Sequence, residues 1–143
     1  MPRTFFTSDT HFGHANVIKY SNRPFATVEE MDEALVDNWN SVVGARDIVY
    51  HLGDVSLARP SLVEPVLKKL KGDIRLVAGN HDYRARKSAV YKDRFTWIKD
   101  MHHMKVRLAG DDKSTHVVLC HYPLLQWNRG HYGSWMLHGH SHG

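Results

Sequence analysis

Short clusters of Asp, Asn and His residues recur along the sequence, and nearly every one directly follows a segment typical of a β-strand. The five clusters span residues 9–11, 53–54, 79–82, 121–123 and 139–142. Ligands of open α/β sheets bind beyond the carboxyl ends of the strands, so clusters that are distant in sequence can converge there. The chain is therefore expected to adopt a fold that brings several strand ends to one place.

The first half of the chain alternates predicted strands with predicted helices. Strands are expected over residues 3–8, 47–52 and 74–78, which are rich in β-favouring and apolar residues. Helices are expected over residues 27–43, where apolar residues recur at steps of three and four, and over residues 61–70. This order favours parallel strands with helices on their outer faces.

Both predicted helices carry signals at their ends. Thr27 with Glu30 forms a capping box at the start of the first helix, and Ser61 with Glu64 forms one at the start of the second. Gly44 stands where a left-handed residue would end the first helix.

In the second half of the chain, the sequence pattern predicts another helix and a further set of strands. A basic helix is expected over residues 83–95, and residues 104–108 and 115–120 are expected to pair as a hairpin. A last strand is expected over residues 135–137. The whole pattern predicts a mixed α/β fold.

The composition limits the classes of protein to which this chain can belong. A chain of 143 residues can close one hydrophobic core, so a single domain over residues 1–143 is expected. No apolar stretch approaches the ~18 residues that a membrane span needs, and the single cysteine, Cys120, fits a reducing, cytoplasmic compartment. The 12 histidines nearly equal the 15 acidic residues and are scattered, which favours metal binding over a purification tag.

The charge of the chain is unevenly distributed. Residues 68–107 hold 12 basic and four acidic residues, a net charge of +8, while the rest of the chain sums to −4. This basic segment is compatible with an anionic substrate or with nucleic acid, although a lysine-rich, solvated helix face is favoured for most of these residues.

The clusters offer oxygen and imidazole donors without thiolates, which suits Mn²⁺, Fe or Zn²⁺. Asp9 and His11 are two residues apart, as are His140 and His142, so an extended backbone directs each pair to one side. Glycine leaves room where backbone passes close to an ion, as expected at residues 53, 79 and 139.

The five clusters, in this order, resemble the calcineurin-like metallophosphoesterase family. Residues 7–14 and 127–130 are similar to its small, capless bacterial and phage members. The resemblance implies the family's four-layer α/β/β/α sandwich of two mixed sheets flanked by helices. Relatives usually continue beyond the residue that matches His142, so a C-terminal truncation of this domain is left open.

The same resemblance assigns metal ligands. It implies that one metal is held by Asp9, His11 and His142, a second by Asn80, His121 and His140, and that Asp54 bridges the two. Two divalent cations are implied, with Mn²⁺ favoured and Fe, Zn or Ni as alternatives.

Other residues receive roles in catalysis and substrate binding. His81 is expected to face the leaving group, with Asp54 and Asn80 as the other catalytic residues. His14, Asn80 and Arg129 are expected to bind substrate. Asp82 is expected either to orient His81 or to cap the basic helix.

These assignments predict a dinuclear metal-dependent phosphoesterase. Two dications against two carboxylates leave a site of about +2, which attracts a phosphate ester and stabilises charge on its oxygens. A hydroxide bridging the two metals would then attack phosphorus in a monoester or a diester. One alternative is a metal-dependent nuclease acting on DNA or RNA, and a more remote one is a non-catalytic scaffold of the same fold. The oligomeric state is left open.

Overall fold

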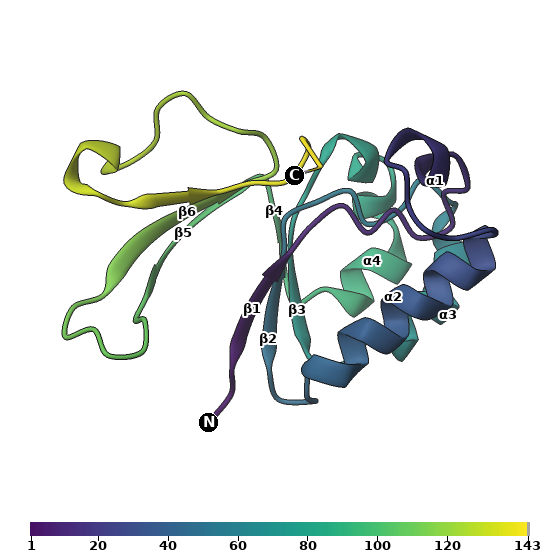
Figure 1. The fold of residues 1–143 in the computed structure, drawn as a ribbon, viewed down its shortest axis with the longest axis horizontal. Helices are drawn as coiled ribbons and strands as arrows, with labels where there is room; N and C mark the ends of the chain where they lie inside the picture. Colours follow the sequence, from purple (N-terminus) through teal and green to yellow (C-terminus); the bar gives the residue numbers. More distant parts are fainter. Residues whose placement is uncertain (143) are drawn as a thin grey trace.

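The computed structural model describes residues 1–142 and contains two β-sheets (Figure 1). The first sheet is parallel throughout and has the strand order β1 (Thr4–Thr7), β2 (Ile48–His51), β3 (Asp73–Val77) and β4 (Ile98–Lys99). The second sheet is mixed, because β6 (Thr115–Cys120) pairs antiparallel with β5 (Met101–Val106) and parallel with β7 (Trp135–Leu137).

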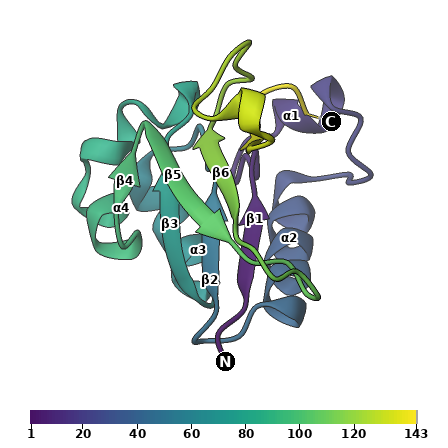
Figure 2. The ribbon, with the colours of Figure 1, turned by 90° about the vertical axis from the view of Figure 1, so that its left-hand side faces the viewer.

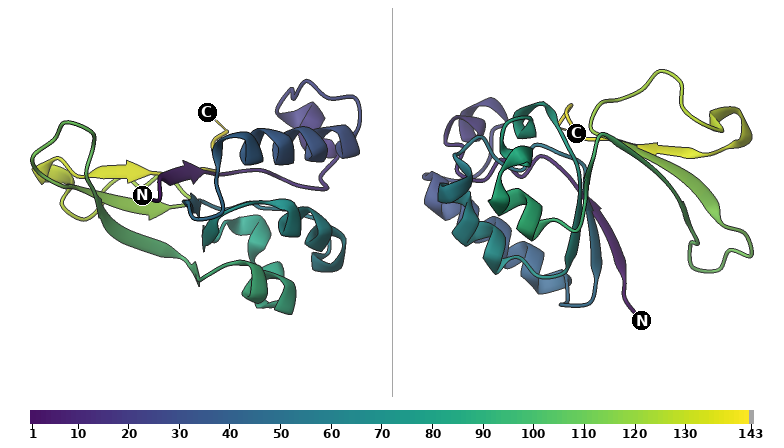
Figure 3. Two further views of the ribbon diagram at one scale, coloured as in Figure 1. Left: turned by 90° about the horizontal axis from the view of Figure 1, so that it is seen from below. Right: turned by 180° about the vertical axis from the view of Figure 1, so that it is seen from behind.

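The helices lie on the face of the first sheet that points away from the second (Figures 1 and 3). They are α1 (Asn16–Tyr20), α2 (Val28–Val42), α3 (Pro60–Lys69) and α4 (Ala89–Arg94), with short 3-10 turns η1 (Asn80–Asp82), η2 (Ala85–Lys87) and η3 (Gly130–Tyr132). This arrangement confirms the predicted α/β class with two sheets flanked by helices. On the outer face of the second sheet, residues 1–142 contribute no α-helix, only the β6–β7 connection, whose Asn128 Nδ2 lies 3.5 Å from His103 Nδ1.

The start of α2 follows its sequence, but its end does not. Thr27 Oγ1 accepts a hydrogen bond from the backbone N–H of Glu30 at 3.1 Å, as a capping residue should. The prediction that Gly44 ends the helix in a left-handed conformation is wrong, because the helix ends in extended Val43. The Gly44 N–H instead donates to Asp47, which holds the turn into β2.

The capping box predicted for α3 is also wrong. This helix begins at Pro60, after Arg59, and no side chain caps its amino end. Proline tolerates the first helical turn because its missing N–H would have no intrahelical partner there. Glu64 is therefore free to pair with Lys68, at 2.8 Å, one turn along the helix.

Several other boundaries differ from the predictions. The basic helix expected over residues 83–95 is split into η2 and α4 by extended Ser88, whose Oγ accepts from the N–H of Tyr91. The hairpin strand expected over residues 104–108 starts earlier, at Met101. The short elements α1 and β4 had no clear sequence pattern. Within residues 1–142, no helix has the length and apolar character that a membrane span requires.

Two hydrophobic cores lie on opposite faces of the first sheet. One fills the space between that sheet and the helices, and includes Ile74, Leu76 and Tyr91. The other joins the two sheets and includes Tyr50 and Leu119. The second core matters for function because it fixes β6, which ends directly before His121.

We predict that Leu119→Ala lowers the free energy of unfolding by about 2–5 kcal/mol, since the removed side chain is fully buried between the sheets. The matched control is Leu125→Ala, where 94% of the residue is exposed and a change below about 0.5 kcal/mol is expected. Urea denaturation followed by circular dichroism measures both. Equal losses in the two variants would contradict the assigned packing.

Candidate metal centre

Parallel pairing brings the loops after β1, β2 and β3 to one edge of the first sheet. Thr7 pairs with His51 and His51 with Leu76, so the three strands end nearly level with one another. The pairing continues past β1, because the N–H of Asp9 donates to the carbonyl of Gly53 at 2.8 Å. The loops that carry the predicted ligands are therefore neighbours.

The C-terminal segment reaches the same edge from the second sheet. The N–H of Gly139 donates to the carbonyl of His121 at 3.0 Å, and the N–H of His140 donates to the Asp9 carboxylate at 3.1 Å. In Figure 2 the yellow segment after β7 runs to the side of α1. Ser21, which follows α1, contacts His142 through its hydroxyl, 3.1 Å from Nδ1.

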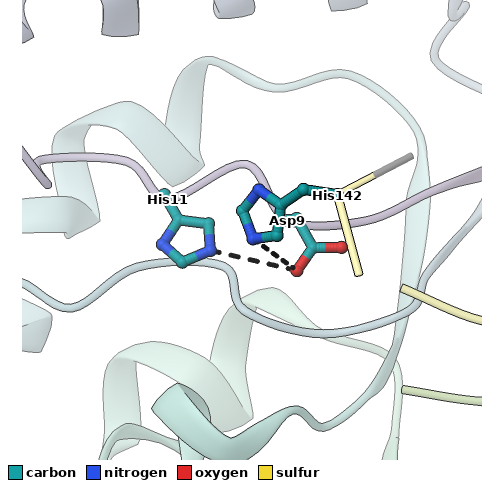
Figure 4. A group of neighbouring side chains, drawn as sticks. All are labelled: Asp9, His11 and His142. Carbon is teal, nitrogen blue, oxygen red and sulfur yellow. Dashed lines mark ion pairs between the residues drawn. The ribbon is translucent and has the colours of Figure 1, made fainter. Parts of the chain in front are cut away.

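Two groups of side chains could each hold a metal ion. The first consists of Asp9, His11 and His142, and the second of Asp54, His121 and His140. Within each group, the candidate ligand atoms lie within 4.8 Å of one another. Figure 4 shows the first group, in which both imidazoles point to one carboxylate oxygen of Asp9, at 3.9 and 3.6 Å.

Asp54 lies between the two groups. Its Oδ2 is 3.2 Å from His121 Nε2 in its own group and 3.7 Å from His11 Nε2 in the other. Its Oδ1 accepts a hydrogen bond from the N–H of His81 at 3.0 Å. One carboxylate thus faces ligand atoms of both groups, which is the position that a bridging ligand requires.

The donor atoms fit divalent cations. His11 Nε2 is buried and has no hydrogen-bond partner among the described residues, although a buried polar atom normally has one. His121 Nδ1 donates to the carbonyl of Leu52 at 2.6 Å, which leaves the lone pair on Nε2 directed into the site. An imidazole held by its far nitrogen in this way is typical of a metal-binding histidine.

The backbone at these residues is unusual. Five of the seven non-glycine residues with a left-handed backbone in residues 1–142 are Asp9, His11, Asp54, His140 and His142, with φ between 51° and 68°. This conformation is disfavoured for side chains with a Cβ, and it tends to occur where function requires it. The turn at each ligand directs its side chain toward the shared space.

Glycines leave the space that the side chains fill. A Cβ on Gly139 would lie 2.5 Å from Asp9 Oδ2, and one on Gly53 would lie 2.6 Å from His121 Nδ1. A Cβ on Gly79 would collide with the carboxylate of Asp54. The three glycines expected from the sequence to pass close to the site are therefore in direct contact with candidate ligands.

The two carboxylates are strongly acidic for buried groups. Burial raises the pKa of Asp9, but the nearby side chains of His11 and Ser8 and the charge of His121 outweigh it, so that this pKa is well below its ordinary range. Burial also raises the pKa of Asp54, but the close approach of His121 and the hydrogen bond from the N–H of His81 outweigh it, so this pKa too is below its ordinary value. Both groups are ionised at neutral pH, as metal ligands must be.

Arg23 stabilises the loop after β1, a role that the sequence did not indicate. Its guanidinium donates to the backbone carbonyls of Asp9, at 2.6 Å, and Thr10, at 2.8 Å. On the other side of the same loop, the N–H of Gly13 donates to both carboxylate oxygens of Asp32 in α2. These contacts hold the strained loop after β1 in place.

Asp82 supports the site from behind rather than through His81. Its buried carboxylate accepts hydrogen bonds from the N–H groups of Gly79, Asp54 and Val55, at 2.7–2.9 Å. Neither of the two expected roles, orientation of His81 or capping of the basic helix, describes these contacts. Asp82 instead ties the loop after β3 to the loop after β2.

The remaining predicted residues divide into near and distant ones. Asn80 and His81 are in η1 at the rim of the site, where His81 is exposed, and the His81 ring lies 5.5 Å from that of His11. His14 Nδ1 is 3.1 Å from His11 Nδ1. Arg129 is not brought to the site: its guanidinium stacks on Tyr132 beside η3, at the outer end of the second sheet (Figure 1).

The distance of Arg129 from the site could not be predicted from sequence, because it depends on the path of the long connection between β6 and β7. Its charge acts on His116, near the start of β6, while His121 follows the end of that strand. The two histidines are five residue steps apart in extended chain, about 16 Å. A substrate held at the candidate metal centre is thus far from Arg129.

His51 is a buried, neutral histidine under the loops. Its Nδ1 accepts from the N–H of Gly53 at 3.1 Å, so its Nε2 carries the proton and faces Thr10 Oγ1 at 3.0 Å. The Thr10 hydroxyl in turn donates to the carbonyl of Val55 at 2.9 Å. This chain of hydrogen bonds joins the first two ligand loops below the candidate ligands.

Comparison with known proteins agrees with this geometry. The model of the calcineurin-like phosphoesterase family matches residues 2–143. The chain belongs to the calcineurin-like phosphoesterase family. Family membership and the two residue groups together support a metal-dependent phosphoesterase in general.

Proteins similar to this chain occur in an archaeon and in phages. An uncharacterized protein of Methanocaldococcus jannaschii, MJ1445, is 36% identical over 99% of this chain and 70% of its own length. The gene 66 proteins of mycobacteriophages L5 and D29 are 32% and 33% identical over 99% of this chain and 78% and 79% of theirs. The phage relatives agree with the expected resemblance to small phage members.

A solved structure has the same fold. The protein of unknown function AQ665 from Aquifex aeolicus superposes with a TM-score of 0.64 at 28% identity. The match covers 86% of this chain and 62% of the solved one, so this chain spans about three fifths of that protein's length.

We predict that Arg23→Lys weakens the binding of a divalent cation by about 10–100-fold, because an ammonium cannot hold two carbonyls in the fixed fork of a guanidinium. Isothermal titration calorimetry of the metal-free protein with Mn²⁺ measures the affinity. The control is Arg107→Lys, an exposed residue after β5. An unchanged affinity in Arg23→Lys would contradict a supporting role.

We further predict that His51 makes the metal-free protein sensitive to acid. Burial lowers the pKa of His51 to about 4, although the charges of Asp9 and Asp54 raise it and those of His121 and His11 lower it further. Since the unfolded chain takes up this proton near pH 6.5, stability is complete above that pH and falls by about 3 kcal/mol by pH 4.

The comparison is with His51→Asn, whose amide oxygen can still accept from Gly53 and does not titrate. Urea unfolding between pH 7 and pH 4, with metal removed from both proteins, measures the difference, because the other histidines titrate in each. The variant should lose about 3 kcal/mol less than the parent over this range. Parallel pH profiles would refute the prediction.

Proposed function

We propose that this protein hydrolyses phosphate esters, monoesters or diesters, with two divalent cations held by the two groups of ligands. One cation would be bound by Asp9, His11 and His142, the other by Asn80, His121 and His140, with Asp54 shared between them. The observation that carries the proposal is the Asp54 carboxylate, which faces imidazoles of both groups at 3.2 and 3.7 Å.

The bound cations would supply Lewis acidity, polarising phosphoryl oxygens and lowering the pKa of the attacking water. The chain supplies the ligands of the cations in a fixed geometry, and few of these ligands are charged. Asp9 and Asp54 are the two carboxylates among the proposed ligands, and Asn80 adds a neutral oxygen. The excess positive charge that remains attracts an anionic ester.

His81 is the proposed general acid. Its backbone is held by the hydrogen bond from its N–H to Asp54 Oδ1 at 3.0 Å, while the residue itself is exposed at the rim of the site. Hydrolysis adds the oxygen of water to phosphorus and breaks the bond from phosphorus to the leaving oxygen. The proton from an imidazolium at His81 would go to that oxygen, and a proton from water would restore the imidazolium.

Turnover and metal content test the proposal together. Metal-free protein should bind two equivalents of Mn²⁺, and turnover of 4-nitrophenyl phosphate or of bis(4-nitrophenyl) phosphate should depend on the added metal. Mn²⁺, Fe²⁺, Zn²⁺ and Ni²⁺ are compared, and the ratio of the two rates measures the preference for monoester or diester. Binding of fewer than two ions, or no turnover with any metal, would overturn the dinuclear hydrolase.

We predict that His81→Ala retains both metals and loses turnover by about 10²–10⁴-fold, the usual contribution of a general acid. Metal analysis and initial rates on both chromogenic esters measure the two properties. The matched control is His131→Ala, an exposed histidine in η3 at the far end of the second sheet. Loss of metal from His81→Ala would show that this histidine is a ligand instead.

A further inference from the structure

A groove continues from the candidate metal centre on the side of His81. It has a volume of about 500 Å³ and lies between the loop after β2 and the segment that contains η1 and η2. Its lining includes Arg59, Asn80, His81, Tyr83 and Arg84. This volume is within the range of sites that bind small molecules.

We propose that this groove binds the leaving-group side of a single-stranded oligonucleotide, which makes phosphodiesters of nucleic acid the substrate class of the centre. The inference rests on the proposed function, because it uses His81 as the residue that faces the leaving group. The groove residues that lie beyond His81 would then contact the rest of the leaving group.

Two arginines give the groove a positive charge that a ligand can reach. Arg59 approaches from the start of α3 and Arg84 from the turn after η1, and both are exposed. Neither forms an ion pair within residues 1–142, in contrast to Arg86, which pairs with Asp100. An arginine fork matches the geometry of a phosphate, so the pair is suited to the phosphate next to the scissile one.

Tyr83 gives the groove an exposed aromatic side chain. The residue is 65% exposed, and Lys87 Nζ lies over one face of its ring, 5.0 Å from the centre, so a base would stack on the opposite face with a third positive charge nearby. Aromatic rings interleaved with basic residues are typical of sites for single-stranded nucleic acid, where an unpaired base stacks on the ring. A base-paired nucleotide would not offer its face, so the single strand fits better than the duplex.

The experiment compares an ester with an uncharged leaving group and one whose leaving group carries the next nucleotide. Bis(4-nitrophenyl) phosphate is the first, and a short oligothymidylate is the second. The test variant is Arg59→Ala/Arg84→Ala in the full chain. Its control, Arg46→Ala/Arg107→Ala, removes two exposed arginines elsewhere, so both proteins have the same net charge.

The ratio of kcat/KM for oligothymidylate to kcat/KM for the chromogenic diester should fall at least tenfold in the test variant. In the control the ratio should change by less than about twofold. The slope of log kcat/KM for oligothymidylate against log salt should lose about 1.4, or 0.7 for each cation removed. Tyr83→Leu should raise KM for the oligonucleotide about fivefold or more, with a smaller effect on kcat.

An unchanged ratio in the test variant, or an equal fall in the control, would overturn the proposal that the groove binds an oligonucleotide. Fluorescence anisotropy of a labelled oligothymidylate tests it without turnover: wild-type protein should bind at least tenfold more tightly than the test variant. Equal affinities would also overturn the groove. Arginine-dependent binding without hydrolysis of either ester would support the groove and refute the proposed function, so the two failures are distinguishable.

Discussion

The parallel pairing of β1, β2 and β3 is the constraint on which the site depends. Parallel strands that run level with one another end at a common edge, so the loops that follow them begin within a few ångströms of each other. Here the pairing of Thr7 with His51 and of His51 with Leu76 sets that edge. The second sheet then delivers His121 and the C-terminal segment to it, held by the core that contains Tyr50 and Leu119. A shift of one residue in either strand pairing would turn side chains to the opposite face and separate the ligands.

The loops at this edge are strained, and buried polar groups stabilise them. A left-handed backbone at a residue with a Cβ costs about 1–3 kcal/mol, and five candidate ligands adopt it. Arg23, Asp82 and His51 each donate to or accept from the backbone of these loops, so the strain is offset by hydrogen bonds made where water has little access. The three side chains contribute no ligand atom to either group. Their role is to hold the geometry in which the ligands face one another before any ion arrives.

An exposed rim results from the same architecture. The candidate ligands nearest the sheet, such as Asp54 and His121, are buried, whereas His140, His142, Asn80 and His81 are exposed. The base of the site is rigid and its rim is open, so the side chains beside the rim decide which substrates the site accepts. The groove with Arg59, Tyr83 and Arg84 adjoins the rim at His81. The basic segment of the sequence therefore has two different parts: Arg86 forms an ion pair with Asp100, while Arg84 lines the groove together with Arg59, which precedes that segment.

By itself, the sequence determined the kind of elements and the kind of chemistry. Apolar periodicity and strand composition predicted α2, β1, β2, β3 and the pair β5–β6, because these signals are local, and the resemblance indicated both groups of candidate ligands. Helix ends were less predictable: Gly44 and Ser61 had suitable neighbours in sequence, but contacts with Asp47 and the proline at position 60 decided the outcome. Only the tertiary structure revealed Arg23 and the true contacts of Asp82, since their partners are backbone groups that every residue carries. It also separated Arg129 from the site, because the end point of a long connection depends on packing over a whole sheet rather than on the residues nearby.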